Sequence, residues 1–297
     1  IFRNLVRKWA PEALLFTEMI NANSLELGYG TNKLEELSKE KGPIGVQLFD
    51  HRPKAMVEAA KKAEQAGAFL IDINMGCPVK KIARKGGGSG LLKDWNLAAK
   101  IIHEVANAVR IPVTVKTRLG WCDKTYDPVK LCVFLQDAGA SLITLHGRTR
   151  KQGFSGKADW NAIANVKQAL KIPVIANGDI SNPEEASKCL AITHADGIMI
   201  GRGSMGAPWL VGQINSFLKG LQPLEEPPPK EKLIIALEQL NGLLKTNGDH
   251  GLLIARKHLN WTCTGFDGSS LFRKSLLRAD TPNEAISLLE KKINSFK

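Results

Sequence analysis

The chain has 297 residues, of which 43% are hydrophobic and 24% charged, a composition typical of a folded globular protein. No apolar run approaches the roughly 20 residues of a membrane span, so we expect no membrane association. The five widely spaced cysteines include no C-x-x-C pair, so we expect no metal site and reduced thiols in the cytoplasm. The formal net charge of +12 suggests a polyanionic partner, most often a nucleic acid.

The first residues have apolar side chains at helical spacing, at Phe2, Leu5, Val6 and Trp9. No strand pattern, start methionine or targeting segment comes before them. We therefore expect a fragment that begins in a helix and lacks a first strand.

Beyond this start, apolar runs typical of buried strands alternate with amphipathic segments typical of helices. Strands are expected at Leu14–Met19, Ile44–Phe49, Leu70–Asn74, Val113–Thr117, Leu142–His146, Val174–Asn177 and Gly197–Ile200. Helices are expected at Lys54–Ala66, Ala98–Val109, Pro128–Ala138, Trp160–Leu170 and Pro183–Leu190. This alternation indicates a parallel sheet, and seven units are one short of a (β/α)8 barrel. The predicted fold class is α/β, a TIM barrel without its first strand.

An open, doubly wound sheet is the alternative fold. No G-x-G-x-x-G turn follows the first strand, which argues against it. Polar residues also end most strands, and in a barrel they would face one mouth. They are Glu18, Gln47, Asn74, Lys116, His146, Asn177 and Arg202. Each alone could serve only the fold, but their recurrence at equivalent points favours a shared site.

The composition changes at LEEPPPK, residues 224–230, where three prolines predict a stiff linker. Helices are expected beyond it at Lys230–Lys245, Leu252–Trp261 and Thr281–Ile293. We therefore predict a barrel domain over residues 1–223, the linker at 224–230 and a helical domain over 231–297.

The stretch from Leu70 to Gly90 is the candidate reaction centre. Cys77 follows a buried strand directly, in the sequence Asn74-Met75-Gly76-Cys77-Pro78, and Pro78 prevents the strand from continuing. A basic segment comes next, with Lys80, Lys81, Arg84 and Lys85, and then the glycine run 86–88, which we predict to be a mobile lid loop. A buried structural cysteine is the alternative, since free cysteines are commonly buried.

The last two strands predict a phosphate site. Asn177-Gly178-Asp179 follows one strand and Gly201-Arg202-Gly203 follows the next, so that backbone N–H groups and a guanidinium can meet phosphate oxygens. A phosphate there would suit flavin mononucleotide (FMN). Gln47 could then bond the edge of the ring system, and Lys116 could stabilise negative charge on the reduced ring.

Several motifs together resemble the tRNA-dihydrouridine synthases, most closely the bacterial B-type branch. They are the Cys77 motif, Lys116-Thr117-Arg118, His146-Gly147-Arg148-Thr149, Gly156-Lys157-Ala158-Asp159-Trp160, Asn177-Gly178-Asp179, Gly201-Arg202-Gly203 and Arg256-Lys257-His258-Leu259-Asn260-Trp261. The resemblance covers nearly the whole chain. It implies an FMN-containing barrel with a helical tRNA-binding domain, which reduces a uridine of tRNA with NADPH as the reductant.

The resemblance also implies roles for individual residues. Cys77 would protonate C5 of the uracil while reduced flavin delivers hydride to C6; a thiol is mostly protonated at neutral pH, as a proton donor must be. The FMN positions would be Gln47, Lys116, His146, Asn177, Gly178, Asp179, Gly201 and Arg202. The substrate positions would be Asn74, Arg118 and Arg148 near the flipped-out uridine, with Lys80, Lys81, Arg84, Arg256 and Lys257, and also Arg150 and Lys151, at tRNA phosphates.

The family's first strand ends in an Ala-Pro-Met segment that is missing here, so we expect weak FMN retention. Two rival functions stay open: an FMN barrel that reduces a free pyrimidine or another activated alkene, and an RNA-binding scaffold without activity. The sequence does not indicate which tRNA uridine is modified or the oligomeric state.

Overall fold

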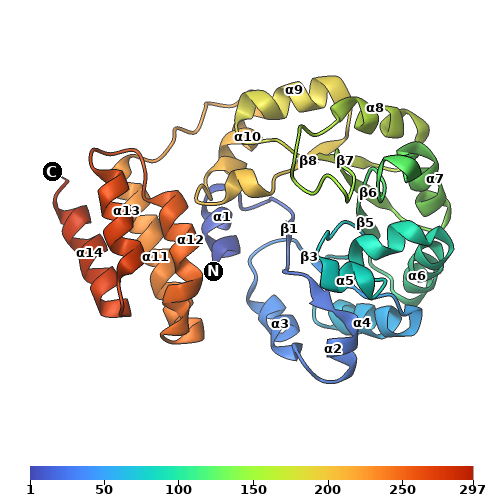
Figure 1. The fold of residues 1–297 in the computed structure, drawn as a ribbon, viewed down its shortest axis with the longest axis horizontal. Helices are drawn as coiled ribbons and strands as arrows, with labels where there is room; N and C mark the ends of the chain where they lie inside the picture. The colour runs from blue at the N-terminus through green and yellow to red at the C-terminus, as the bar shows by residue number, and fades with distance from the viewer. Residues whose placement is uncertain (297) are drawn as a thin grey trace. The chain divides into compact units, whose positions relative to one another are not determined.

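The computed structural model describes residues 1–296 (Figure 1). Contacts within the chain define two compact units, and both are discontinuous in sequence. The barrel unit contains residues 12–180 and 184–200, and the helical unit contains residues 1–11, 181–183 and 201–297. This division assigns residues 1–11 and 201–223 to the helical unit, whereas the sequence analysis put them in the barrel domain.

The barrel unit is built on a parallel sheet whose strand order is β1-β3-β4-β5-β6-β7-β8, with β2 beside β3. The strands are β1 (Leu15–Phe16), β2 (Ile20–Asn21), β3 (Ile44–Phe49), β4 (Leu70–Asn74), β5 (Val113–Arg118), β6 (Leu142–His146), β7 (Val174–Asn177) and β8 (Gly197–Met199). The curled parallel sheet with flanking helices confirms the predicted barrel-type fold. Within the described residues β1 and β8 do not pair with each other, so each forms an edge of the sheet.

The first expected strand, Leu14–Met19, is interrupted, because only Leu15–Phe16 and then Ile20–Asn21 join the sheet. Between them, the Thr17 hydroxyl accepts the backbone N–H of Gln47 at 3.1 Å, a bond that a backbone carbonyl makes in a regular ladder.

Helices surround the outer side of the sheet (Figure 1). They are α2 (Ala22–Glu26), α3 (Thr31–Glu35), α4 (Pro53–Gln65), α5 (Lys80–Arg84), α6 (Trp95–Ala108), α7 (Pro128–Asp137), α8 (Trp160–Ala169) and α9 (Pro183–Thr193). Three of them begin at an aspartate whose carboxylate accepts a backbone N–H of the first turn: Asp94 for α6, Asp127 for α7 and Asp159 for α8. These caps fix where each helix leaves the carboxyl edge of the sheet.

The predicted lid loop is wrong for this structure. Lys80–Arg84 form the short helix α5, and the backbone from Gly87 to Gly90 is buried against it. A Cβ atom at Gly90 would lie 2.6 Å from the carbonyl oxygen of Ala83. The glycines therefore allow close packing of backbone on backbone rather than motion.

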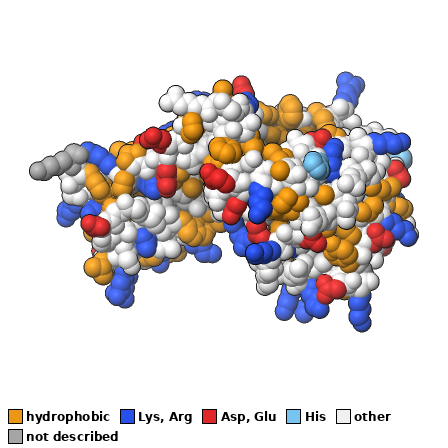
Figure 2. Space-filling model, turned by 90° about the horizontal axis from the view of Figure 1, so that it is seen from above, with side chains coloured by type: hydrophobic (Ala, Val, Ile, Leu, Met, Phe, Trp, Pro, Cys, Tyr) orange, Lys and Arg blue, Asp and Glu red, His pale blue; other side chains and the backbone are white. Residues whose placement is uncertain are grey.

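The helical unit contains α1 (Phe2–Trp9), α10 (Leu210–Leu218), α11 (Pro229–Asn247), α12 (His250–Thr262), α13 (Ser269–Arg278) and α14 (Pro282–Asn294). Its core consists of buried leucines and small residues from the last four helices, among them Leu240, Leu259 and Leu289. The sequence analysis missed α13 because only Leu276 of that helix is buried, which leaves a weak apolar pattern. Within the described residues, no helix combines the length and apolarity needed to cross a membrane. Figure 2 shows Lys and Arg side chains at several separate places on the face in view.

Candidate active site

The carboxyl ends of the parallel strands bring the predicted residues to one edge of the sheet. Register pairs Asn74 of β4 with Lys116 of β5, and pairs His146 of β6 with both Arg118 and Asn177. In barrels of this kind, catalytic residues come from this edge. These paired residues are therefore neighbours at the edge, and their use as one functional site stays a prediction.

Cys77 lies on a turn that side-chain bonds hold in place. The Asn74 Oδ1 atom accepts the backbone N–H groups of Gly76 at 3.2 Å and Cys77 at 3.0 Å. The Cys77 carbonyl accepts the N–H of Ser89 at 3.2 Å, which ties the turn to the glycine run. Cys77 is 9% exposed as a residue, and these bonds hold its backbone in position.

A fully buried carboxylate, Asp72, lies behind this turn and was missed by the sequence analysis. Gln47 Nε2 donates to Asp72 Oδ2 at 2.6 Å, and the Thr114 hydroxyl donates to Asp72 Oδ1 at 2.7 Å. Burial raises the pKa of Asp72 to about 6, although these two bonds oppose the shift. An aspartate inside an apolar strand was the available signal, because a charged residue is rarely buried without partners.

Lys116, on β5, forms a hydrogen bond with a residue of β7, across the intervening strand β6. Its Nζ donates to Asn177 Oδ1 at 3.0 Å, and Asn177 Nδ2 donates to the Met199 carbonyl at 2.8 Å. Burial lowers the pKa of Lys116 to about 8, and the negative charge of Asp72 partly opposes this. The ammonium therefore still carries its charge at pH 7.

His146 is uncharged in this site. Burial is the main cause that lowers its pKa to about 3, and the positive charges of Arg118, Lys116 and Arg148 add to the effect. At neutral pH the ring of His146 is therefore in its neutral form, and no imidazolium is present to act as an acid. It can still form hydrogen bonds as a neutral ring.

The chain matches the dihydrouridine synthase family (Dus) over residues 1–297. It belongs to the dihydrouridine synthase family.

Relatives extend the match to full-length proteins. The chain is 49% identical over 297 residues to the probable tRNA-dihydrouridine synthase 1 of Synechocystis sp. (strain ATCC 27184 / PCC 6803 / Kazusa), covering 100% of this chain and 84% of the relative. It is 42% identical over 255 residues to tRNA-dihydrouridine synthase B of Xanthomonas axonopodis pv. citri, covering 84% and 75%. These matches confirm the family predicted from the motifs, including its B-type branch.

A solved structure supports the fold alone. Histamine dehydrogenase from Rhizobium sp. 4-9 superposes with a TM-score of 0.57 at 14% identity, over 74% of this chain and 42% of that one.

The two arginines that the dihydrouridine synthase resemblance assigns to the uridine are bound to the protein itself. Arg118 Nε donates to the Gly76 carbonyl at 2.7 Å, and its Nη1 donates to the Gly153 carbonyl at 2.9 Å. Arg148 Nη2 donates to Asp179 Oδ2 at 2.7 Å, and its Nη1 lies 3.3 Å from His146 Nε2. Both arginines therefore brace the loop after β6, and their contact with substrate stays a prediction.

The predicted phosphate residues are divided between the units. Asn177, Gly178 and Asp179 lie in the barrel unit, whereas Gly201 and Arg202 lie in the helical unit, so a joint phosphate site stays a prediction. The Asp179 carboxylate accepts from the Ala158 N–H at 2.7 Å as well as from Arg148. Asp179 thus shapes the loop on which a phosphate would rest.

The predicted RNA contacts differ in exposure. Lys80, Lys81 and Arg84 are exposed on α5, which begins three residues after Cys77. Lys257 is exposed on α12, but Arg256 is half-buried and donates to the Ala279 carbonyl at 3.2 Å. Lys257 is therefore the more accessible of the two, and phosphate contacts of either residue stay a prediction.

The donors at the sheet edge fit a flavin ring. Gln47 Nε2 has two N–H groups and the Lys116 ammonium has three, and one bond from each is made to the described residues of the protein. The remaining N–H groups match the oxygen and nitrogen acceptors along a flavin's edge. The chemistry of this donor set therefore agrees with the family's cofactor.

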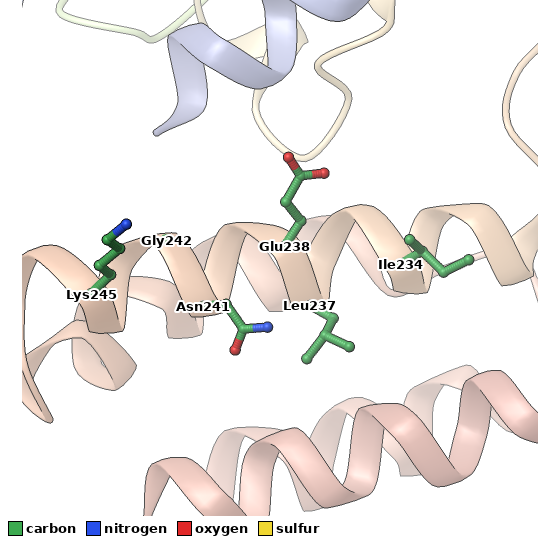
Figure 3. Close-up of a pocket in the computed structure, with 6 residues that line it drawn as sticks. All are labelled: Ile234, Leu237, Glu238, Asn241, Gly242 and Lys245. Atoms are coloured by element: carbon green, nitrogen blue, oxygen red, sulfur yellow. The ribbon is translucent and has the colours of Figure 1, made fainter. Parts of the chain in front are cut away.

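A separate hollow lies along α11 in the helical unit (Figure 3). Its lining consists of Ile234, Leu237, Glu238, Asn241, Gly242 and Lys245. None of these is a predicted site residue, and Glu238 already pairs with Lys8 at 2.6 Å.

Proposed function

We propose that the protein is a flavin-dependent tRNA-dihydrouridine synthase in which Cys77 protonates the uracil ring. The C5–C6 double bond of one uridine gains a hydride at C6 and a proton at C5. Bound flavin would supply the hydride, with NADPH as the reductant that returns it. The observation that carries the proposal is the fixed position of Cys77 at the same sheet edge as Gln47 and Lys116.

The choice of proton donor rests on the charge states at the edge. Neutral His146 has no charged form to act as an acid at pH 7, and a guanidinium does not release its proton. Lys116 is held by Asn177 and keeps its positive charge, which suits stabilisation of an anionic ring. The Cys77 thiol is thus the proton donor, while Gln47 and Lys116 hold the cofactor.

The substrate is tRNA, whose uridine leaves its stack to reach the sheet edge. Exposed lysines and arginines of α5 and α12 would bind phosphates, in agreement with the net charge of +12. A further basic group lies on the loops after β4, β5 and β6, where Lys93 Nζ and the Arg150 guanidinium lie 4.0 and 4.3 Å from the Trp121 ring centre. We place the enzyme in the cytoplasm with the tRNA pool.

Replacement of Cys77 by Ala tests the proposal. Dihydrouridine formation, measured by mass spectrometry of tRNA from a dihydrouridine-free strain, should fall by at least a hundredfold, within the range for loss of a general acid. Binding of tRNA and reduction of the flavin by NADPH should persist. Cys132→Ala, the same change at a buried cysteine on α7 away from the carboxyl edge, is the matched control.

Each contrary outcome identifies a different error. Full dihydrouridine formation by the C77A variant would remove Cys77 from the mechanism. Reduction of free uracil without tRNA would support the small-molecule reductase instead. A wild-type protein that binds tRNA but never bleaches a flavin would support the inactive scaffold.

A further inference from the structure

A continuous series of buried hydrogen bonds runs from Asp72 to the backbone of Cys77. Gln47 Nε2 donates to Asp72 Oδ2 at 2.6 Å, and Asn74 Nδ2 donates to Gln47 Oε1 at 2.8 Å. Asn74 Oδ1 then accepts the N–H groups of Gly76 and Cys77. Asp72 is fully buried, and Gln47 and Asn74 are largely buried, so few water molecules can replace these bonds.

This series has a single direction, because an ionised carboxylate can only accept hydrogen bonds. The amide nitrogen of Gln47 must therefore face Asp72, which leaves its oxygen facing Asn74. Asn74 must in turn present nitrogen to Gln47, which leaves its oxygen facing the Cys77 turn. The buried charge at one end and the two backbone N–H donors at the other thus support the same orientation of both side-chain amides.

We propose that Asp72 is a positioning residue that acts through Gln47 and Asn74 on the Cys77 turn. Its effect on chemistry rests on the function proposed above for Cys77. Two consequences follow at the sheet edge. The turn that carries the thiol is held by an acceptor that cannot flip, and Gln47 offers an N–H rather than an oxygen to a bound ring.

Two substitutions at Asp72 separate this role from simple filling of the core. Asp72→Asn can preserve the series, since its oxygen can accept from Gln47 while its nitrogen donates to the Thr114 hydroxyl. That hydroxyl already lies 3.4 Å from the Ile71 carbonyl, which can accept its hydrogen. Asp72→Val suits a buried strand but offers Gln47 Nε2 no acceptor, so Gln47 loses its anchor and Asn74 is oriented by the two backbone N–H groups alone.

The test is amide hydrogen exchange at Gly76 and Cys77 in the flavin-free protein, followed by mass spectrometry. Loss of the acceptor should speed exchange there by about tenfold in the D72V variant, the effect of one hydrogen bond. The D72N variant should stay within twofold of wild type. Thr114→Val is the matched control, because it removes a partner of Asp72 that lies outside the series.

Two further measurements connect the series to the cofactor and to catalysis. Fluorescence titration with FMN should show about tenfold weaker binding for D72V, and near-normal binding for D72N. The two substitutions should not be additive, because both interrupt the same series of hydrogen bonds. The double variant D72V/N74A should form dihydrouridine less than twofold more slowly than the single variant Asn74→Ala.

The proposal is overturned by normal exchange at residues 76–77 in D72V, or by equal acceleration in D72V and D72N. If D72V does not fold, Gln47→Met interrupts the same series and should accelerate exchange alike; normal exchange in that variant also overturns it. A wild-type protein that forms no dihydrouridine would refute the proposed function. The exchange rates would still show whether Asp72 acts through Gln47 and Asn74 on the Cys77 turn.

Discussion

The ion pair between Arg148 and Asp179 offers a quantitative test of how the loop after β6 is held. The Arg148 side chain is 2% exposed and that of Asp179 is 34% exposed. The two hydrogen bonds from Arg148 Nη2 and the Ala158 N–H end on the same carboxylate oxygen, Oδ2. Asp179→Asn can place its single carbonyl oxygen there and keep both bonds, whereas Asp179→Ala removes them.

The expected losses in the free energy of unfolding follow from this geometry. Removing one partner of a fully buried pair costs roughly 3–5 kcal/mol, which we reduce to about 2 because Asp179 is partly exposed. The abandoned Ala158 N–H adds about 1 kcal/mol. Asp179 also has φ at +55°, where alanine costs about 1 kcal/mol more than aspartate or asparagine. Asp179→Ala should therefore lose about 4 kcal/mol, and Asp179→Asn, which loses only charge, about 1.5.

Urea unfolding of the flavin-free protein measures both values. Glu104→Ala, which removes an exposed pair with Lys100 on α6, serves as the control and should change stability by less than about 0.5 kcal/mol. Equal losses for the alanine and asparagine variants would show that the charge, and not the bonds to Oδ2, holds the loop. Losses below about 1 kcal/mol for both would refute the buried-pair reasoning altogether.

Four other outcomes are expected. Because burial lowers the pKa of Lys116 to about 8, its charge is lost as pH rises through that value, so the pH–rate profile for dihydrouridine formation should fall above about pH 8. Asp72→Asn should move this fall to lower pH, since the Asp72 carboxylate raises the pKa of Lys116. An unmoved profile would show that the charge of Asp72 does not act on Lys116. Burial raises the pKa of the Cys132 thiol to about 12, so peptide mapping after iodoacetamide should find it unmodified while half-buried Cys122 reacts. Gly90→Ala should lower the free energy of unfolding in urea by about 1–3 kcal/mol, because the added Cβ would lie 2.6 Å from the Ala83 carbonyl oxygen. An unchanged free energy of unfolding would mean that α5 shifts away from residue 90 at little cost.

The sequence predicted the alternating sheet and the family well, because these depend on local patterns. Apolar runs and capping residues mark strands and helices directly, and the carboxyl ends of parallel strands meet wherever they lie in the sequence. Gln47, Asn74 and Lys116 could therefore be grouped from the sequence alone.

Features that depend on contacts across the sheet could not be predicted in this way. In the sequence, Asp72 is a single polar residue in an apolar strand, and only the structure shows that Gln47 and Thr114 donate hydrogen bonds to it. Arg118 and Arg148 matched a substrate pattern, yet their bonds to backbone carbonyls depend on how the loop after β6 folds back. The glycine run suggested motion, because nothing in the sequence places α5 against it.

Helix α1 gives the molecule an unusual order of assembly. Leu5 of α1 is buried with Trp209 and Ile235, and Lys8 pairs with Glu238, 230 positions later in the chain. A ribosome releases α1 before its partners Trp209, α10 and α11 have been made, so Leu5 lacks these contacts while the barrel unit is synthesised. Closing so long a loop is slow. A protein shortened to residues 1–223 would keep the packing of α1 against Trp209 and α10 but lose its contacts with Ile235 and Glu238 of α11.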